Sequence, residues 1–432
     1  MAGNNNSKNA SAENATANSP FANPWVQLLV GVICMAAVAN LQYGWTLFVN
    51  PIDAKYHWGR AAIQVAFSLF VLLETWLIPV EGYMVDQFGP RWVVMVGGIL
   101  VACAWLLNSL AGSLPLLYFA AALGGIGTGC VYGTCVGNAL KWFPGRRGLA
   151  AGVTASGFGA GAALTVGPIR TMIESSGYEQ AFLVFGLIQG GIVFVMSWLL
   201  LAPPPQIAGA AVKPSQTSHG YTPIDVLQSP VFYVMYLMFV LIAAGGLTMA
   251  ASMAPIAEDF KISKIPVELF GMILPALGFA LFLNRIFDGV GRPFFGWLSD
   301  QIGREYTMAL AFLIGAVALF TLSRSGSNPV IFVLVTALYF GVYGEIFSLF
   351  PATQGDTFGS KFAAANNGML YTAKGAGSLL VPIAAIIAKS HGWGTVFTVA
   401  MTFNVVAALL ALFVLKPMRA RHFAKSRATF ET

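Results

Sequence analysis

The feature that most constrains this chain is a series of apolar stretches, each long enough to cross a lipid bilayer as one helix. A helical span needs about 20 apolar residues. Twelve such stretches can be counted, at about residues 25–50, 61–84, 92–112, 115–139, 148–171, 180–202, 230–254, 267–294, 306–324, 329–350, 364–389 and 394–415. Charged residues make up only 9% of the chain, too few to cover the surface of a soluble domain. The sequence therefore predicts an all-α membrane protein in a lipid bilayer, and excludes a soluble enzyme and a nucleic-acid-binding protein.

The stretches divide into six and six around the longest polar interruption. Residues 25–202 and 230–415 are predicted to form two six-helix bundles, joined by a central loop at 203–229 that begins with three prolines. Residues 1–24 are polar and are predicted to be a disordered tail. Residues 416–432 are predicted to be a basic tail.

The distribution of lysine and arginine between the spans predicts the orientation of the chain. If both termini are cytoplasmic, the inner segments carry 13 of the 23 lysines and arginines, the outer segments carry 7, and three lie within spans. Cytoplasmic loops of membrane proteins are enriched in these two residues. Both tails and the central loop are therefore predicted to be cytoplasmic.

A repeated loop motif relates the two halves of the chain. Gly82-Tyr-Met-Val-Asp-Gln-Phe-Gly-Pro-Arg recurs 214 residues later as Gly296-Trp-Leu-Ser-Asp-Gln-Ile-Gly-Arg, in each case after the second span of its half. Parallel repeats of six spans are the layout of one large transporter class. The motif resembles the signature of the major facilitator superfamily, which implies the major facilitator fold with twelve transmembrane helices. The predicted gating residues of the two copies are Gly82, Asp86, Gly89, Arg91, Gly296, Asp300, Gly303 and Arg304.

Ionisable residues inside the spans are the candidates for a functional site. Such residues cost about 2.5–3.5 kcal/mol each on insertion scales and are functional by default. Helix rise places Arg292 about 12 Å and Lys374 about 15 Å from the membrane edge, near the midplane where transporters bind substrate. The six residues considered are Glu74, Arg285, Asp288, Arg292, Glu345 and Lys374.

Three of these charges share one face of the eighth span. Arg285, Asp288 and Arg292 are spaced by three and four residues, so Asp288 can pair with either arginine. If it neutralises Arg285, then Arg292 and Lys374 leave about two uncompensated positive charges, and such a cavity requires an anion. The alternative is that all six charges form internal ion pairs that only hold the helices together.

Aromatic residues are predicted to line the same region and to enclose a small planar anion. Tyr371 lies three residues before Lys374 and therefore shares its helix face. Tyr132 and Tyr371 are the strongest candidates because of their depth. The full set is Tyr43, Trp45, Tyr132, Tyr343 and Tyr371.

Several sequence blocks resemble one family within that superfamily. The blocks are Gln42-Tyr-Gly-Trp-Thr-Leu, Tyr132 with Lys141-Trp-Phe-Pro and Arg147-Gly-Leu, Arg292-Pro-Phe-Phe-Gly, Leu349-Phe-Pro, and Asn367-Gly followed by Lys374. They look like the bacterial oxalate:formate antiporter family, in the monocarboxylate-transporter branch. The resemblance implies that Arg292 and Lys374 hold the two carboxylates of oxalate. It also implies that the protein lies in a bacterial cytoplasmic (inner) membrane. It also places six residues at matching pocket positions: Gln42, Tyr43, Tyr132, Tyr343, Phe347 and Tyr371.

The chain departs from the antiporter pattern at three positions. The antiporter family has tryptophan where Tyr343 and Tyr371 stand, and a neutral residue where Asp288 stands. An aspartate four residues before the arginine is instead characteristic of proton-coupled lactate and pyruvate carriers. These departures bear on the walls of the cavity and on the coupling of transport to protons.

Two transport functions are therefore predicted as alternatives. The first is exchange of oxalate for formate or related carboxylates, favoured because an empty cavity with two cations would resist closing. The second is proton–monocarboxylate symport with Asp288 as the proton carrier. Glu74, Arg285 and Glu345 are assigned to coupling or charge balance. The sequence predicts no enzyme, cofactor or metal site, and we expect a monomer whose partners are small organic anions.

Overall fold

The computed structural model describes residues 21–204, 217, 220–269, 271–359 and 361–430, and these are mostly helical. Prolines stand in the first turn of many helices, where their missing N–H group costs no hydrogen bond. The first half contains α2 (Pro24–Val38), α3 (Asn40–Tyr43), α4 (Thr46–Tyr56), α5 (Arg60–Trp76), α6 (Ile78–Phe88), α7 (Pro90–Ser109), α8 (Leu114–Trp142), α9 (Arg147–Ser176) and α10 (Tyr178–Ser197).

The second half follows a short helix in the central loop, α12 (Pro223–Leu227), which begins with a capping box between Thr222 and Asp225. The last helix of the second half, Lys416–Phe430, extends beyond the bundle. The elements are α13 (Pro230–Asp259), β1 (Pro266–Leu269), β2 (Met272–Pro275), α14 (Ala276–Ile302), α15 (Arg304–Ser325), α16 (Pro329–Tyr343), α17 (Ile346–Phe358), α18 (Ala363–Ser378), α19 (Val381–His391), α20 (Trp393–Leu409), the π-helix η1 (Leu410–Leu415) and α21 (Lys416–Phe430).

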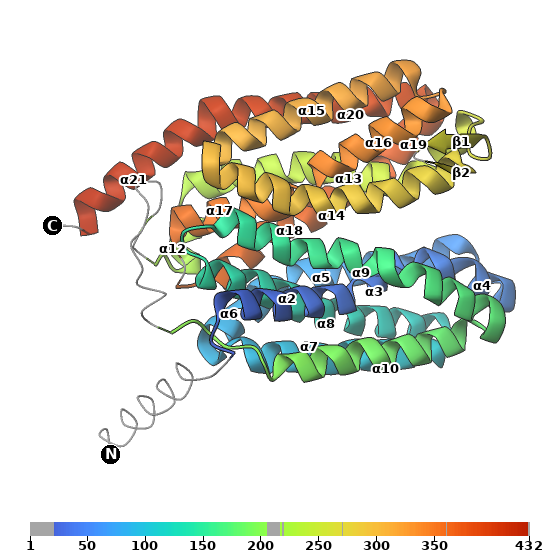
Figure 1. Cartoon of the computed structure of the whole chain (residues 1–432), viewed down its shortest axis with the longest axis horizontal. Coiled ribbons are helices and arrows are strands. Elements are labelled where there is room, and N and C mark those ends of the chain that lie inside the picture. Colours follow the sequence, from blue (N-terminus) through green and yellow to red (C-terminus); the bar gives the residue numbers. More distant parts are fainter. Residues whose placement is uncertain (1–20, 205–216, 218–219, 270, 360, 431–432) are drawn as a thin grey trace.

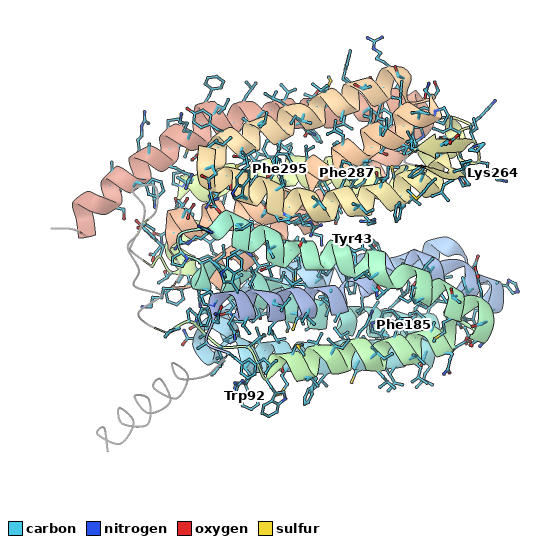
Figure 2. The ribbon with its side chains drawn as sticks, in the orientation of Figure 1. Tyr43, Trp92, Phe185, Lys264, Phe287 and Phe295 are labelled. Atoms are coloured by element: carbon cyan, nitrogen blue, oxygen red, sulfur yellow. The ribbon has the colours of Figure 1, made fainter. Side chains whose placement is uncertain are left out.

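The helices lie in two groups with their axes roughly along the long axis of the molecule (Figure 1). Helices α2–α10 form the lower group and α13–α20 the upper group, and α9 and α14 lie against each other at the boundary between them. Trp92 and Lys264 lie at opposite ends of the long axis (Figure 2). We call the end that contains Trp92 the motif end, because the loops between α6 and α7 and between α14 and α15 lie there.

The outer surface has the character that a bilayer requires. Eight helical segments among the described residues are long and apolar enough to cross a membrane, and the bent pair α5–α6 makes nine. The three other predicted spans correspond to α9, α14 and the consecutive helices α18 and α19. Large apolar side chains are exposed along the bundle, which is unusual for a soluble protein; among them are Leu106, Phe119, Val317, Phe320 and Phe413.

The start of the eighth predicted span differs from the sequence expectation. The apolar composition predicts a helix from residue 267, but Pro266–Leu269 and Met272–Pro275 form two antiparallel strands in which Val267 pairs with Leu274. Proline at both ends of the hairpin and Gly271, which has a φ of +73°, favour a turn over a helix. The helix that carries the charged residues therefore begins only at Ala276.

The repeated glycines of the loop motif end one helix and begin the next. Gly89 has a φ of +84° between α6 and α7, and Gly303 has a φ of +100° between α14 and α15. Only glycine adopts this backbone conformation without steric cost. The two copies of the motif therefore form equivalent tight connections in the two halves.

Candidate substrate site between the two halves

Helices from both halves bring the predicted site residues together near the middle of the molecule. From the first half, α3 carries Gln42 and Tyr43, α5 carries Glu74 and α8 carries Tyr132. The second half contributes α14, α16, α17 and α18. Figure 2 shows Tyr43 at the boundary between the two groups of helices. A site of this kind is completed only when the two halves pack against each other.

Arg292 is buried, with 1% of its surface exposed, and its guanidinium is held from two sides. Its Nη2 donates to Oδ2 of Asp288 at 2.7 Å, and its Nε lies 3.4 Å from Oδ1. Its Nη1 donates to the carbonyl oxygen of Ala155 on α9 at 2.8 Å. Arg292 therefore links the second half to the first while it is paired with a carboxylate on its own helix.

The structure decides between the two pairings of Asp288 that the sequence leaves open. Asp288 pairs with Arg292 and not with Arg285, so the case in which Arg292 is left unpaired is not the one observed. The guanidinium of Arg285 instead lies 4.2 Å from the ring centroid of Tyr43, a cation–π contact. The physical reason is helix geometry, because an acid four residues before a base is the favourable order for an ion pair.

Lys374 is also paired, with a carboxylate from the other half of the chain. Its Nζ lies 3.2 and 3.3 Å from the two carboxylate oxygens of Glu74, and both side chains are buried. It also contacts Oε1 of Gln42 at 3.3 Å and the hydroxyl of Tyr371 at 3.1 Å. Of these partners only Tyr371 lies on the helix of Lys374.

These two ion pairs correct the expectation of about two uncompensated cations. In this conformation, Arg292 and Lys374 each have a carboxylate partner, as in the alternative of internal ion pairs. The argument that an empty site resists closing therefore does not hold here, because Asp288 and Glu74 already balance the cations. A preference for exchange must rest on other grounds.

The two cations nevertheless lie over the same aromatic ring. The Arg292 guanidinium carbon is 4.6 Å from the centroid of the Phe347 ring, and the Lys374 Nζ is 6.0 Å from the same centroid. The ring belongs to α17, whereas the cations belong to α14 and α18. The fold therefore brings together two residues that are 82 positions apart in the sequence.

The aromatic residues predicted from the sequence surround this pair of cations. The rings of Tyr132 and Tyr371 lie 4.6 Å apart across the boundary between the halves. Phe347 is 6.1 Å from Tyr371 and 5.7 Å from Tyr343. Trp45 is different, because it lines a separate pocket within the first half beside Phe48.

Two buried glutamates lie outside this cluster of contacts. Glu345 precedes α17, and its carboxylate oxygens have no hydrogen-bond partner among the described residues. Glu81 on α6 is 6% exposed and packs against Gly129 and Cys130 of α8. Glu81 was not among the residues singled out from the sequence, although its position inside the second predicted span marks it as a charge within the membrane.

The motif end of the boundary is closed by a network of charged residues. Arg147 on α9 lies 3.1 Å from Asp356 on α17, which also pairs with Arg304 at 2.9 Å. Arg304 pairs with Asp300 at 2.7 Å, and Asp300 accepts hydrogen bonds from the backbone amides of Gly148 and Leu149. The network therefore ties the second copy of the motif to the first half. Asp356, its central carboxylate, was not among the residues singled out from the sequence.

Glycines of the motif allow the two halves to approach closely. A Cβ atom at Gly296 would overlap the backbone of Gly148, and one at Gly82 would overlap the backbone of Ala364. Arg91 follows Gly89 in the first turn of α7. The side chain of Asp86 lies outside the described part of the structure. Contacts of the motif aspartate are therefore described only for Asp300, in the second copy.

Outward-facing apolar helices around a charged site between two halves define a multi-pass membrane transporter. The chain belongs to the major facilitator superfamily: the sequence profile of the family described as Major Facilitator Superfamily matches residues 28–292 and 270–431. Solved structures agree at the level of the fold. The proton:xylose symporter XylE has a TM-score of 0.68 at 12% identity, covering 91% of this chain and 96% of that chain. The fucose:proton symporter FucP of E. coli has a TM-score of 0.64 at 15% identity, covering 91% and 98%.

Relatives by sequence include carboxylate transporters. The oxalate:formate antiporter of Oxalobacter formigenes is 34% identical over 400 residues, which cover 92% of each chain. Monocarboxylate transporter 11 of Mus musculus is 26% identical over 270 residues, covering 61% of this chain and 58% of that one. These similarities identify a carboxylate transporter of the superfamily rather than an enzyme, and confirm the fold class and the family expected from the sequence.

Proposed function

We propose that this protein exchanges small carboxylates across the bacterial cytoplasmic membrane, with oxalate and formate as its substrates. The observation that supports this most directly is the placement of Arg292 and Lys374 over the ring of Phe347, 4.6 and 6.0 Å from its centroid. Two cations at one small site suit a dicarboxylate. The preference for oxalate and formate, and for exchange, rests on the similarity to the Oxalobacter formigenes antiporter.

Each cation has a distinct role in this proposal. Arg292 provides a planar fork that binds one carboxylate through two parallel hydrogen bonds, whereas Lys374 provides a compact charge for the other. The flat faces of Tyr132, Tyr371 and Phe347 enclose the planar anion. Gln42, Tyr43 and Tyr343 complete the pocket, and the Tyr343 hydroxyl has no hydrogen-bond partner among the described residues.

Transport follows from the movement of the two halves relative to each other. In the conformation described here, the network around Asp356 closes the motif end, which we assign to the cytoplasm on the distribution of lysine and arginine. Opening of this end requires the contacts of Arg147 and Asp300 to break. Arg91, Gly82 and Asp86 of the first motif copy are assigned to the same gate.

Counterflow into proteoliposomes tests the proposed function. Proteoliposomes that contain the purified protein and are loaded with unlabelled oxalate or formate should take up labelled oxalate. Uptake should be poor when the proteoliposomes contain no internal substrate. Lactate and pyruvate provide comparison substrates. Absence of oxalate counterflow with either internal anion would contradict the proposal.

A second arm of this experiment distinguishes proton symport from exchange. A symporter would accumulate monocarboxylate after an external acid pulse without internal substrate, and Asp288→Asn would abolish that uptake. In the exchanger, Asp288 serves to orient Arg292, and Asp288→Asn should lower oxalate affinity while counterflow persists. Acid-driven accumulation that is lost in Asp288→Asn would favour the symporter.

A further inference from the structure

The numbers of donors on the two cations set different conditions for anion binding. The ammonium of Lys374 has three N–H groups, and four acceptor atoms surround it: two oxygens of Glu74, one of Gln42 and the hydroxyl of Tyr371. Every donor is therefore engaged. A substrate carboxylate reaches Lys374 only if it displaces a present partner, and Glu74 is the only charged one.

Arg292 is in a different position, because its guanidinium has five N–H groups. Asp288 occupies the edge formed by Nε and Nη2, and the Ala155 carbonyl accepts one hydrogen from Nη1. One hydrogen on Nη1 and one on Nη2 are engaged by neither of these acceptors, and the neutral hydroxyl of Tyr43 is hydrogen-bonded to the guanidinium. Arg292 can therefore bind a carboxylate by displacing a neutral hydroxyl, without losing Asp288.

Glu74 cannot remain a carboxylate after displacement. It is completely buried, and Lys374 is the cation with which it pairs. An ionised carboxyl group left without a partner in a buried site is far less stable than its protonated form. Displacement from Lys374 is therefore linked to uptake of a proton by Glu74.

We propose that Glu74 is a proton-binding site that is filled when a dicarboxylate binds and is empty when a monocarboxylate binds. This inference rests on the proposed function. The second carboxylate of oxalate replaces the Glu74 carboxylate on Lys374, and Glu74 takes one proton from water on the open side. Formate needs only the N–H groups of Arg292 that Asp288 does not engage, and it leaves the Glu74–Lys374 pair intact.

The groups around Glu74 are consistent with this assignment. Lys374 on α18 contacts Glu74 directly, and Tyr371 on α18 and Gln42 on α3 contact the same ammonium group. Tyr132 on α8 and Glu81 on α6 are titratable groups close enough to interact electrostatically with Glu74, and Cys130 lies beside Glu81.

The proposal determines the charge moved in one exchange cycle. Oxalate carries two negative charges and enters with one proton, whereas formate carries one negative charge and leaves without a proton. The exchange therefore moves no net charge across the membrane. Without a proton on Glu74, the same exchange would move one net negative charge.

Binding of labelled oxalate and formate to the purified wild-type protein, measured at several pH values above about 5.5 where oxalate remains a dianion, tests the proposal. Linkage to one proton predicts that the Kd for oxalate rises by up to about tenfold per pH unit. The Kd for formate should not change. A pH-independent Kd for oxalate would overturn the proposal, whereas absence of binding by both anions would contradict the proposed function itself.

Glu74→Gln and Glu345→Gln form a matched pair of variants, because both replace a fully buried carboxyl group. Glu74→Gln should make the oxalate Kd independent of pH and make oxalate–formate exchange sensitive to an imposed membrane potential. Glu345 has no hydrogen bond to either cation in the structure, so the present proposal gives it no part in coupling. Glu345→Gln should therefore retain the pH dependence and the insensitivity to membrane potential of the wild type. Loss of the pH dependence in Glu345→Gln together with its retention in Glu74→Gln would overturn the assignment to Glu74.

Discussion

Glu74 and Lys374 face each other across the boundary between the two halves, with both carboxylate oxygens within 3.3 Å of the ammonium nitrogen. They are 300 positions apart in the sequence. In the site proposed here, this contact occupies the place of a substrate carboxylate. The state of the pair therefore decides whether the protein binds one carboxylate group or two.

Lys374→Gln should weaken dicarboxylate binding strongly while a monocarboxylate still binds at Arg292. A hydrogen bond to a charged group contributes about 1.5–3 kcal/mol, so oxalate affinity should fall about 10- to 100-fold. Formate affinity should change much less. Equilibrium binding of both labelled anions to the purified variant provides the measurement, and unchanged oxalate affinity would remove Lys374 from the site.

Arg292→Lys should fail to support exchange although the positive charge is kept. Lysine lacks the planar fork that holds Asp288 on one edge and a substrate carboxylate on the other. Oxalate counterflow should fall by about tenfold or more, corresponding to about 1.4 kcal/mol of lost interaction. Counterflow at the wild-type rate would show that only the charge at this position matters.

Asp356→Asn should destabilise the conformation in which the motif end is closed. The variant leaves Arg147 and Arg304 without their shared buried carboxylate, and breaking a buried ion pair costs about 3–5 kcal/mol. Cysteines introduced in the loops of the motif end should become more accessible to a water-soluble thiol reagent. Lys55→Gln is the control, because its pair with Glu179 is exposed and within one half. An equal rise in accessibility for both variants would contradict a specific role for Asp356.

Gly152→Ala should hinder close approach of α9 and α14. A Cβ atom at this position would overlap the backbone of Arg292, whereas one at Gly191 would meet no atom within 4 Å. Overpacking costs about 1–3 kcal/mol, so exchange should fall about 5- to 100-fold in Gly152→Ala. Gly191→Ala should exchange at the wild-type rate. Equal rates for the two variants, measured by counterflow at matched protein levels, would show that the close approach does not limit transport.

The sequence by itself determined the fold class and the family of this protein. Apolar stretches about 20 residues long have few alternatives to membrane helices, because a bilayer leaves no water to bind an exposed backbone. The repeated loop around Gly82 and Gly296 and the rare charges at Arg292 and Lys374 are also visible in the sequence. The hairpin at 266–275 was missed because a short apolar run does not distinguish a helix from a strand.

Only the tertiary structure decided how the charges are paired. Spacing along α14 allowed Asp288 to pair with Arg285 or with Arg292, and the approach of Tyr43 to Arg285 accompanies the second arrangement. Glu74 and Asp356 acquire their partners through contacts between helices that lie far apart in the sequence. Such pairings depend on the rotation and packing of whole helices, and a linear pattern of residues does not contain that information.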